Sequence, residues 1–163
     1  MNQYQPLINE FVFLLQEALG GEIVSIVLYG SVARGTARAE SDVDLLLILK
    51  EAPADYKTRL KPVLSILKEL RQRSCWRELE ERGLKPFVSV LALSYEEANE
   101  NRYLYLDMID EGQILMDRDG FFQAKLESLR QRLRELGARK VKRNGDWYWD
   151  LKPDLKAGEI IVL

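Results

Sequence analysis

Three features are scarce in this 163-residue sequence: it has no histidine, a single cysteine and no long apolar run. Without histidine, catalysis by a Ser-His-Asp or Cys-His arrangement and zinc binding through imidazole are excluded. Cys75 alone can form neither an internal disulfide nor a thiolate cluster, which favours a reducing compartment. The groups left for catalysis are carboxylates, hydroxyls, lysine and arginine side chains, backbone amides and a hard metal ion bound by carboxylates.

The apolar segments are also too short to span a bilayer, which takes about 20 consecutive apolar residues. The N-terminal residues lack a basic stretch followed by an apolar one, so no signal peptide is expected. A soluble, cytoplasmic protein without a membrane partner is therefore predicted.

Charge is nearly balanced overall, at a formal net charge of -2, but it is unevenly distributed. Residues 125–143 hold eight lysines and arginines and two glutamates, whereas residues 95–119 hold eight acidic residues and two arginines. Solvated helix faces account for runs of this kind. The basic stretch is also a candidate surface for nucleotide phosphates, nucleic acid or an acidic partner.

Apolar periodicity predicts an α+β domain that has a mixed sheet flanked by helices. Strands are predicted at residues 23–29, 42–49, 87–93, 114–116 and 159–163. Helices are predicted at residues 7–18, 55–81, 95–112 and 122–136, with Pro62 in the first turns of the second or dividing it in two. Asn144-Gly145, next to the aromatic run at 147–149, predicts a C-terminal β-hairpin.

This order of elements predicts one domain over residues 1–163. Its core is expected at about residues 1–118, and a helix and hairpin extension at about residues 119–163. On the hairpin, alternation places Trp147 and Trp149 on one face and Tyr148 on the other. Packing against the domain is one role for these rings, and base stacking or contact with a partner is the alternative.

Two aspartates, Asp42 and Asp44, lie at the start of the second predicted strand. Side chains alternate along a strand, so both carboxylates point to the same face, roughly 6–7 Å apart along the backbone. Unpaired carboxylates on one face repel each other, and a divalent cation relieves that repulsion. Magnesium prefers oxygen ligands from one or two carboxylates together with substrate phosphates, so the pair is a candidate magnesium site.

A glycine-serine bend, Gly30-Ser31, comes directly after the first predicted strand. Glycine at the end of a strand allows close approach of the backbone to a ligand, and Ser31 is expected to cap a short helix whose amides face an anion. Arg34 is expected to neutralise phosphate charge through a forked contact.

Taken together, these residues resemble a known signature. Gly30-Ser31, ten intervening residues and Asp42-Val43-Asp44 resemble the motif of the polymerase-β-like nucleotidyltransferases. The full segment LYGSVARGTARAESDVDLLLIL, residues 28–49, is similar to the minimal nucleotidyltransferases of bacteria and archaea. Residues 103–107 and 147–153 are similar to an archaeal-type branch of that group.

The resemblance implies the polymerase-β-like fold and transfer of a nucleoside monophosphate, expected to be AMP from ATP, to an acceptor hydroxyl. It implies that Asp42 and Asp44 are catalytic and hold Mg²⁺, in a site for one or two ions. It assigns nucleotide binding to a further set of residues, namely Gly30, Ser31, Arg34, Gly35 and Ser41.

The sequence departs from the family at one position that matters for catalysis. Members with the full pattern carry a third carboxylate on a later strand, but the strand expected at residues 87–93 has no acid and presents Ser89 instead. Asp107 and Asp110 are the candidates to replace it, with Glu96 and Glu97 behind them.

Two functions follow from these residues. The first is an active transferase with a macromolecular acceptor, and the resemblance implies an antitoxin that adenylylates a HEPN-type toxin. The second is a weakly active or inactive module that binds a nucleotide or a partner, which the missing carboxylate favours. Transfer to an RNA end or to an aminoglycoside ranks behind both, because the sequence shows no additional domain for such a substrate.

Overall fold

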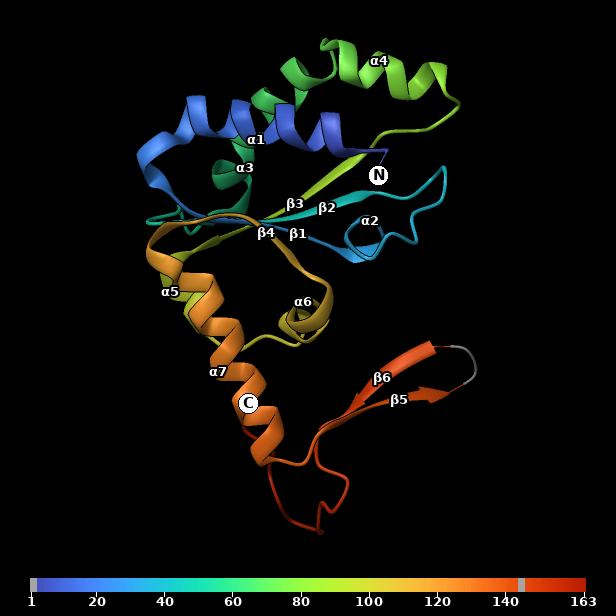
Figure 1. The fold of residues 1–163 in the computed structure, drawn as a ribbon. Coiled ribbons are helices and arrows are strands. Elements are labelled where there is room, and N and C mark those ends of the chain that lie inside the picture. Colours follow the sequence, from blue (N-terminus) through green and yellow to red (C-terminus); the bar gives the residue numbers. More distant parts are fainter. Residues whose placement is uncertain (1–2, 144–145) are drawn as a thin grey trace.

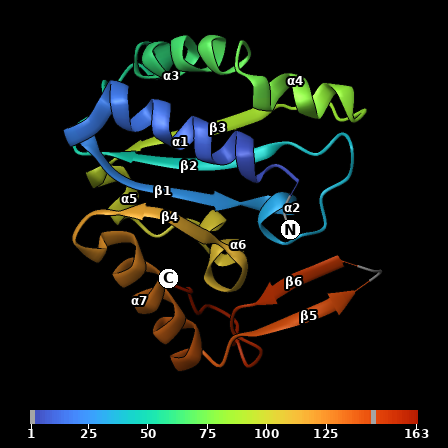
Figure 2. The same cartoon turned by 45° about the horizontal axis from the view of Figure 1, so that its top comes forward.

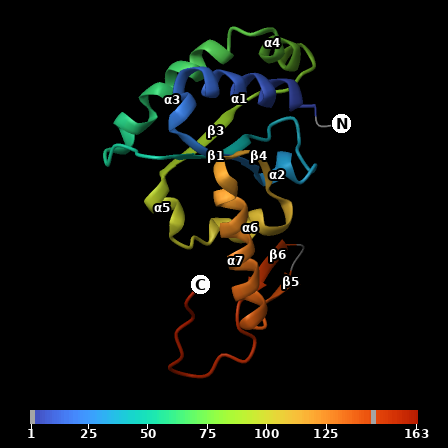
Figure 3. The same ribbon diagram turned by 60° about the vertical axis from the view of Figure 1, so that its left-hand side comes forward.

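A four-stranded sheet with helices on both faces forms the centre of the protein (Figures 1 and 3). The structure is a computed structural model, and it describes residues 3–143 and 146–163. The strands are β1 (Ile23–Tyr29), β2 (Val43–Leu49), β3 (Val88–Ser94), β4 (Gln113–Asp117), β5 (Arg139–Arg143) and β6 (Asp146–Asp150). The α-helices are α1 (Gln5–Leu19), α2 (Gly30–Ala33), α3 (Tyr56–Leu70), α4 (Ser74–Glu81), α5 (Tyr95–Asn99), α6 (Leu104–Glu111) and α7 (Phe121–Glu135). Short 3₁₀ turns, η1 (Gly20–Glu22) and η2 (Arg118–Gly120), precede β1 and α7.

The strand order in the main sheet is β3-β2-β1-β4. β1 is antiparallel to both of its neighbours, β2 and β4, whereas β2 and β3 are parallel. The predicted mixed sheet flanked by helices is therefore confirmed. β5 and β6 form a separate antiparallel pair beyond α7, which confirms the C-terminal hairpin, while Asn144-Gly145 lie outside the described residues.

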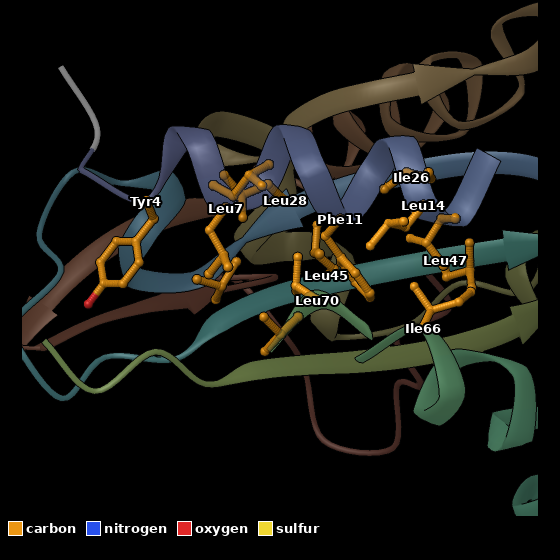
Figure 4. Close-up of a cluster of buried hydrophobic side chains, with 14 of the residues drawn as sticks. Tyr4, Leu7, Phe11, Leu14, Ile26, Leu28, Leu45, Leu47, Ile66 and Leu70 are labelled. Carbon is orange, nitrogen blue, oxygen red and sulfur yellow. The ribbon is translucent and has the colours of Figure 1, made fainter. Parts of the chain in front are cut away.

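Two apolar cores lie on opposite faces of the sheet because side chains alternate along β2. Leu45 and Leu47 face α1, α3 and α4, where they meet Phe11 and Ile66 (Figure 4). Leu46 and other residues of the second cluster face α5, α6 and α7. The central strands are buried on both sides, which explains why residues 23–29 and 43–49 are almost continuously apolar.

The region between residues 95 and 112 contains two helices rather than the single predicted one. The predicted capping box is present: the Ser94 hydroxyl accepts from the Glu97 amide at 3.2 Å, and the Glu97 carboxylate accepts from the Ser94 amide at 2.8 Å. α5 then ends at Asn99, and helix resumes at Leu104, so the prediction is wrong between these residues.

The helix breaks because side chains bind the carbonyls that a longer helix would use. The Arg102 guanidinium donates to the carbonyl of Glu97 at 3.0 Å, and the Tyr105 hydroxyl donates to the carbonyl of Ala98 at 3.0 Å. The Lys125 ammonium donates to the carbonyl of Asn99. Of the three partners only Lys125 is distant in the sequence, 26 residues from Asn99, and none of these contacts is visible in the apolar periodicity.

Pro62 lies inside α3 and does not divide it. The predicted helix at 55–81 is divided instead after Leu70, where the amides of Gln72 and Arg73 form turn hydrogen bonds and α4 begins at Ser74. The predicted end of α7 is confirmed: Gly137 has φ +68° and the amides of Gly137 and Ala138 bond back to the last turn.

The predicted strand at residues 159–163 is wrong, since none of these described residues is in a strand. The tail instead turns back toward α7 (Figure 2). The Arg132 guanidinium donates to the carbonyl of Val162 at 2.9 Å, and Leu163 packs against the second apolar cluster. Side-chain contacts with the helix thus replace pairing with a sheet.

Among the described residues, no helix combines the length and apolar character needed to cross a membrane.

Candidate active site

Asp44 lies at the centre of the site, near the start of β2. It is in register with Tyr29 on β1 and with Ser89 on β3, so three polar residues cross the sheet side by side. Burial is the main cause that raises the pKa of Asp44, and the charge of Asp42 raises it further. The Arg34 charge and a hydrogen bond from the Ser89 hydroxyl act in the opposite direction. Desolvation that disfavours a bare carboxylate also strengthens its attraction for a cation.

Asp42 is exposed and lies directly before β2, which begins one residue later than predicted. Its charge raises the pKa of Asp44 and, after burial, that of Tyr4. The two carboxylates are therefore close enough to repel each other at the open end of the strand. Two carboxylates that repel each other at a strand end are a candidate cation site, and the metal-binding role predicted for Asp42 and Asp44 stays a prediction.

Gly30 joins the glycine-serine bend to this pair by direct contact. Its φ is +74°, and a Cβ at this position would lie 2.4 Å from Oδ2 of Asp44. No side chain fits there unless the carboxylate moves. The positions of Gly30 and Asp44 therefore depend on each other, which explains why the two motifs occur together.

The bend itself is the single-turn helix α2, and its hydrogen bonds differ from those predicted. Ser31 lies inside the turn and does not cap it; Tyr29 precedes the helix without a side-chain cap. Gly35, at φ +72°, closes the turn, with its amide donating to the carbonyl of Val32 and the Thr36 amide donating to the carbonyl of Ser31.

Ser41 stabilises the loop that leads into the aspartate pair. Its hydroxyl accepts from the Arg38 amide at 2.8 Å, and its amide donates to the Arg38 carbonyl at 3.0 Å. The Tyr4 hydroxyl donates to the same carbonyl at 3.2 Å. Ser41 is thus part of a turn, and its predicted contact with a nucleotide stays a prediction.

Glu111 at the end of α6 and Gln113 at the start of β4 contact the bend, and the sequence did not reveal these contacts. Arg34 lies 3.6 Å from the carboxylate of Glu111, and the Gln113 amide donates to the carbonyl of Ala33 at 2.8 Å. Lys140 on β5 lies 3.4 Å from the same Glu111 carboxylate, so an ion-pair chain links the bend to the C-terminal hairpin. In the sequence, these contacts were indicated only by the acidic stretch at residues 95–119 and the basic stretch at residues 125–143.

The amino-acid sequence over residues 8–115, more than half of the chain, matches the family described as "Nucleotidyltransferase domain". This chain belongs to that family. The membership predicted from residues 28–49 is therefore confirmed, and the site described above lies in a nucleotidyltransferase domain.

Similar proteins cover most of the chain. It is 26% identical over 150 residues to "Putative protein adenylyltransferase MJ1305" of Methanocaldococcus jannaschii, covering 86% of this chain and 90% of that protein. A crystal structure of a mutant toxin-antitoxin MntA-HpeT is 18% identical, with a TM-score of 0.49 and coverage of 78% and 89%. A tri-AMPylated Shewanella oneidensis HEPN toxin in complex with MNT antitoxin is 16% identical, with a TM-score of 0.45 and coverage of 80% and 89%. These scores are too low to establish a common fold, so membership rests on the sequence match.

The residue opposite Asp44 on β3 is Ser89. The sequence predicted that Ser89 stands where other members of the family carry the third carboxylate. Glu96 and Glu97 follow the C-terminal end of β3, whereas Asp44 lies at the start of the parallel strand β2, so both glutamates lie at the other end of the sheet. Glu97 is also bound to Arg59 by contacts of 2.6 and 3.1 Å. The prediction that Glu96 or Glu97 replaces the third carboxylate is therefore wrong.

The remaining candidates, Asp107 and Asp110, are exposed on α6. Asp110 lies 3.3 Å from the ammonium of Lys140, so its charge is already balanced within the chain. Asp107 is the candidate for which the structure records no such ion pair.

The donors present fit a magnesium ion that completes its shell with substrate and water. Within residues 3–143 and 146–163, no group of three or more acidic or cysteine side chains is placed to hold a metal by itself. Asp42 and Asp44 carry carboxylates close enough for the charge of Asp42 to raise the pKa of Asp44, and magnesium characteristically takes one or two carboxylates plus phosphate oxygens. The donor set is consistent with an ion that enters together with a nucleotide.

Much of the basic stretch at residues 125–143 pairs within the chain. On α7, Arg130 and Arg134 contact Glu127, and Arg132 contacts Glu135. These contacts agree with a solvated helix face rather than a dedicated phosphate surface.

Basic and aromatic side chains meet on the hairpin. Lys140 lies over Trp149, and Lys142 lies over Trp147, which is 62% exposed. Trp149 packs against the second apolar cluster, which agrees with the predicted packing role for this ring. The Trp147 ring stays at the surface.

Proposed function

We propose that this chain transfers AMP from ATP to a hydroxyl group on a protein. The observation that carries the proposal is the contact between Gly30 and the Asp44 carboxylate, with Asp42 beside it. Family membership supports nucleotidyl transfer, and the name of the Methanocaldococcus jannaschii relative, most of whose length this chain covers, supports an adenylyl group and a protein acceptor.

Asp42 and Asp44 hold the magnesium in this proposal. When bound, the ion neutralises charge on the triphosphate and on the leaving pyrophosphate. The acceptor oxygen bonds to the α-phosphorus as the bond to the pyrophosphate oxygen breaks, and the hydroxyl proton passes to water. Ser89 keeps Asp44 oriented through its hydrogen bond.

The bend at the end of β1 positions the triphosphate. Gly30 and Gly35 let the backbone approach the phosphates closely, and Ser31 and Ser41 lie on the same loop as hydroxyl donors. Arg34 contacts a phosphate by leaving Glu111, whose exposed, 3.6 Å ion pair with it costs little to break. Catalysis then depends on positioning and electrostatics.

The acceptor we propose is a HEPN-type protein, for which this chain acts as antitoxin in the cytoplasm. The resemblance of residues 28–49 to minimal nucleotidyltransferases supports this role.

Transfer is tested with ATP labelled at the α-phosphate, magnesium, and the HEPN-type protein as acceptor. We expect label on the acceptor with α-labelled ATP and none with γ-labelled ATP. The double variant Asp42→Ala/Asp44→Ala should lose transfer, and Glu96→Ala, an exposed acid at the far end of the sheet, should retain it.

The alternative is a module that binds a nucleotide or a partner without turnover, and the serine opposite Asp44 favours it. Calorimetry separates the two functions. Binding of ATP without label transfer or pyrophosphate release would support the module and contradict the transferase.

A further inference from the structure

The carboxylate of Asp44 points to one particular side of the main sheet. Along β2, Leu45 and Leu47 belong to the apolar cluster formed with α1, α3 and α4, whereas Leu46 and Ile48 belong to the cluster formed with α5, α6 and α7. Because side chains alternate along a strand, Asp44 shares the face of Leu46 and Ile48. A nucleotide held at Asp44 would therefore lie on the side of the sheet that carries α6 and the C-terminal hairpin.

The hairpin of β5 and β6 turns one of its faces toward α6. Lys140 is in register with Trp149, and Lys142 is in register with Trp147, so these four side chains share one face. Lys140 contacts Glu111 at the end of α6, and Trp149 packs against the second apolar cluster. The face that carries Lys142 and Trp147 is therefore the one directed toward the body of the domain.

The same face lies near the glycine-serine bend. Glu111 lies 3.6 Å from Arg34 and 3.4 Å from Lys140, so two ion pairs link the bend to the hairpin. Lys142 follows two residues later, about 6–7 Å further along the strand. In Figures 1, 2 and 3 the hairpin and α2 lie on the same side of the molecule. An extended nucleoside triphosphate spans a distance of this order between its terminal phosphate and its base.

Trp147 presents an open ring face at this place. Its side chain is 62% exposed, although the Lys142 ammonium lies over the ring at 5.7 Å from its centroid and covers one face. Trp149 is partly buried by its packing against the second apolar cluster. Exposed aromatic rings next to cationic side chains are the groups on which proteins stack unpaired nucleic-acid bases. Trp147 therefore has the exposure and the neighbour that base stacking requires.

We propose that Trp147 stacks on the base of the nucleotide, so that the hairpin forms the second wall of the nucleotide site. This inference rests on the proposed function, which places the phosphates at the bend and at Asp44. Lys142 holds the ring from its other face. Every base has a π-face, so Trp147 distinguishes a nucleotide from a bare polyphosphate rather than adenine from guanine.

The charges of the hairpin favour a single nucleotide over a nucleic acid as the occupant. Arg139 pairs with Asp150 at 3.7 Å, and Lys140 pairs with Glu111. Among the hairpin side chains that the structure describes, Lys142 is the one cation without a carboxylate partner. Nucleic-acid binding takes most of its affinity from many phosphate contacts, whereas one open ring and one unpaired cation suit a single base.

Isothermal titration calorimetry of the full chain, with magnesium and without an acceptor, tests this contact. Trp147→Ala should weaken ATP binding about tenfold, as expected for the loss of one base-stacking contact, and should leave the binding of inorganic tripolyphosphate unchanged. Trp147→Phe keeps an aromatic ring and should bind ATP nearly as the wild type does. Tyr148→Ala is the matched control, since Tyr148 is 46% exposed on the opposite face of the hairpin, and it should bind ATP as the wild type does.

Tryptophan fluorescence reports on the ring itself. ATP should quench the emission of the wild type, tripolyphosphate should not, and Trp147→Phe should lose the quenching by ATP. Circular dichroism should show that each variant is folded.

An ATP affinity that is unchanged in Trp147→Ala, or an equal loss for ATP and tripolyphosphate, would overturn the proposal. Normal ATP binding by Trp147→Ala with loss of label transfer to a HEPN-type protein would also overturn it and would assign the ring to the acceptor. A wild type that binds ATP through Trp147 but transfers no label would contradict the transferase and support the base contact. A wild type that binds neither ATP nor tripolyphosphate would overturn both.

Discussion

The molecule contains two antiparallel strand pairs that are held in place by different forces. β1 and β2 lie inside the sheet and are buried on both faces, and Gly30 touches the Asp44 carboxylate where the strands meet. β5 and β6 form a two-stranded hairpin, with Lys140 paired to Asp110 and Glu111 on α6. A two-stranded hairpin is at best marginally stable alone, whereas central strands share the stability of the whole core. The position of Asp44 therefore depends on packing of the core, whereas that of the hairpin depends on partly exposed ion pairs together with the packing of Trp149.

Among the variants that test this comparison, Asp44→Asn should change activity the most. We expect loss of adenylyl transfer on the order of 10²–10³-fold, since one preorganised electrostatic contact at the reacting group is removed. The same substitution should increase the stability of the folded state. Burial raises the pKa of Asp44 above that of the unfolded chain, so its stabilising contribution is present at low pH and is lost as pH rises through the raised pKa.

Asparagine cannot ionise and should keep that stability at neutral pH. Without magnesium, Asp44→Asn should melt at a higher temperature than the wild type at pH 7, by roughly 2–4 °C if the gain is about 1 kcal/mol. Magnesium should stabilise the wild type and leave the variant unchanged. Thermal melts with and without magnesium measure both effects, and an unchanged or lower Tm for the variant would show that Asp44 is not destabilised by burial.

Gly30→Ala gives the next largest effect, because it tests whether the bend and the carboxylate are coupled. The new methyl meets Oδ2 of Asp44 and adds a left-handed backbone strain of about 1–2 kcal/mol. Both transfer and stability should fall. Gly35→Ala is the matched control, since its φ is also positive but no atom lies within 4 Å of the added Cβ. If both variants lose activity equally, backbone strain and not contact with Asp44 is the cause.

Arg34→Ala and Glu111→Gln should change nucleotide affinity in opposite directions. Arg34→Ala removes a charge-assisted phosphate contact, commonly worth about 1.5–3 kcal/mol, so ATP should bind about tenfold or more weakly. Glu111→Gln removes the competing carboxylate and should tighten binding by a smaller factor. Isothermal titration calorimetry of both variants measures this. Weaker binding by both would mean that Glu111 positions Arg34 instead of competing for it.

Lys140→Ala has the smallest expected effect and is confined to the hairpin. Its ion pairs to Asp110 and Glu111 are partly exposed and are worth about 0.2–1 kcal/mol, so the global Tm should hardly move. Amide hydrogen exchange in β5 and β6 should accelerate, and high salt should produce the same change in the wild type. Lys142→Ala serves as the control, because Lys142 contacts Trp147 and has no ion pair with any carboxylate whose side chain the structure describes. Equal acceleration in both variants would contradict a specific role for Lys140.

The successes and failures of the sequence predictions follow the range of the interactions. The buried strands β1 and β2 were predictable because continuous apolar runs reflect burial on both faces. The division between α5 and α6 was not, since it depends on Lys125 and on other side chains that bind the carbonyls at the end of α5. The strand prediction for residues 159–163 failed for the same reason. An apolar segment becomes a strand only where a neighbouring strand offers hydrogen bonds, and here the carbonyl of Val162 accepts from Arg132 instead.

By itself, the sequence determined the family and the pair of motifs around Gly30 and Asp44, because their chemistry depends on short spacings along one strand, bend and strand. Only the tertiary structure decided that Glu111 holds Arg34 and that Lys140 ties the hairpin to α6. The reason is physical: these contacts join residues far apart in the chain, and exposed side chains carry no periodic pattern that reveals which of many possible partners they meet.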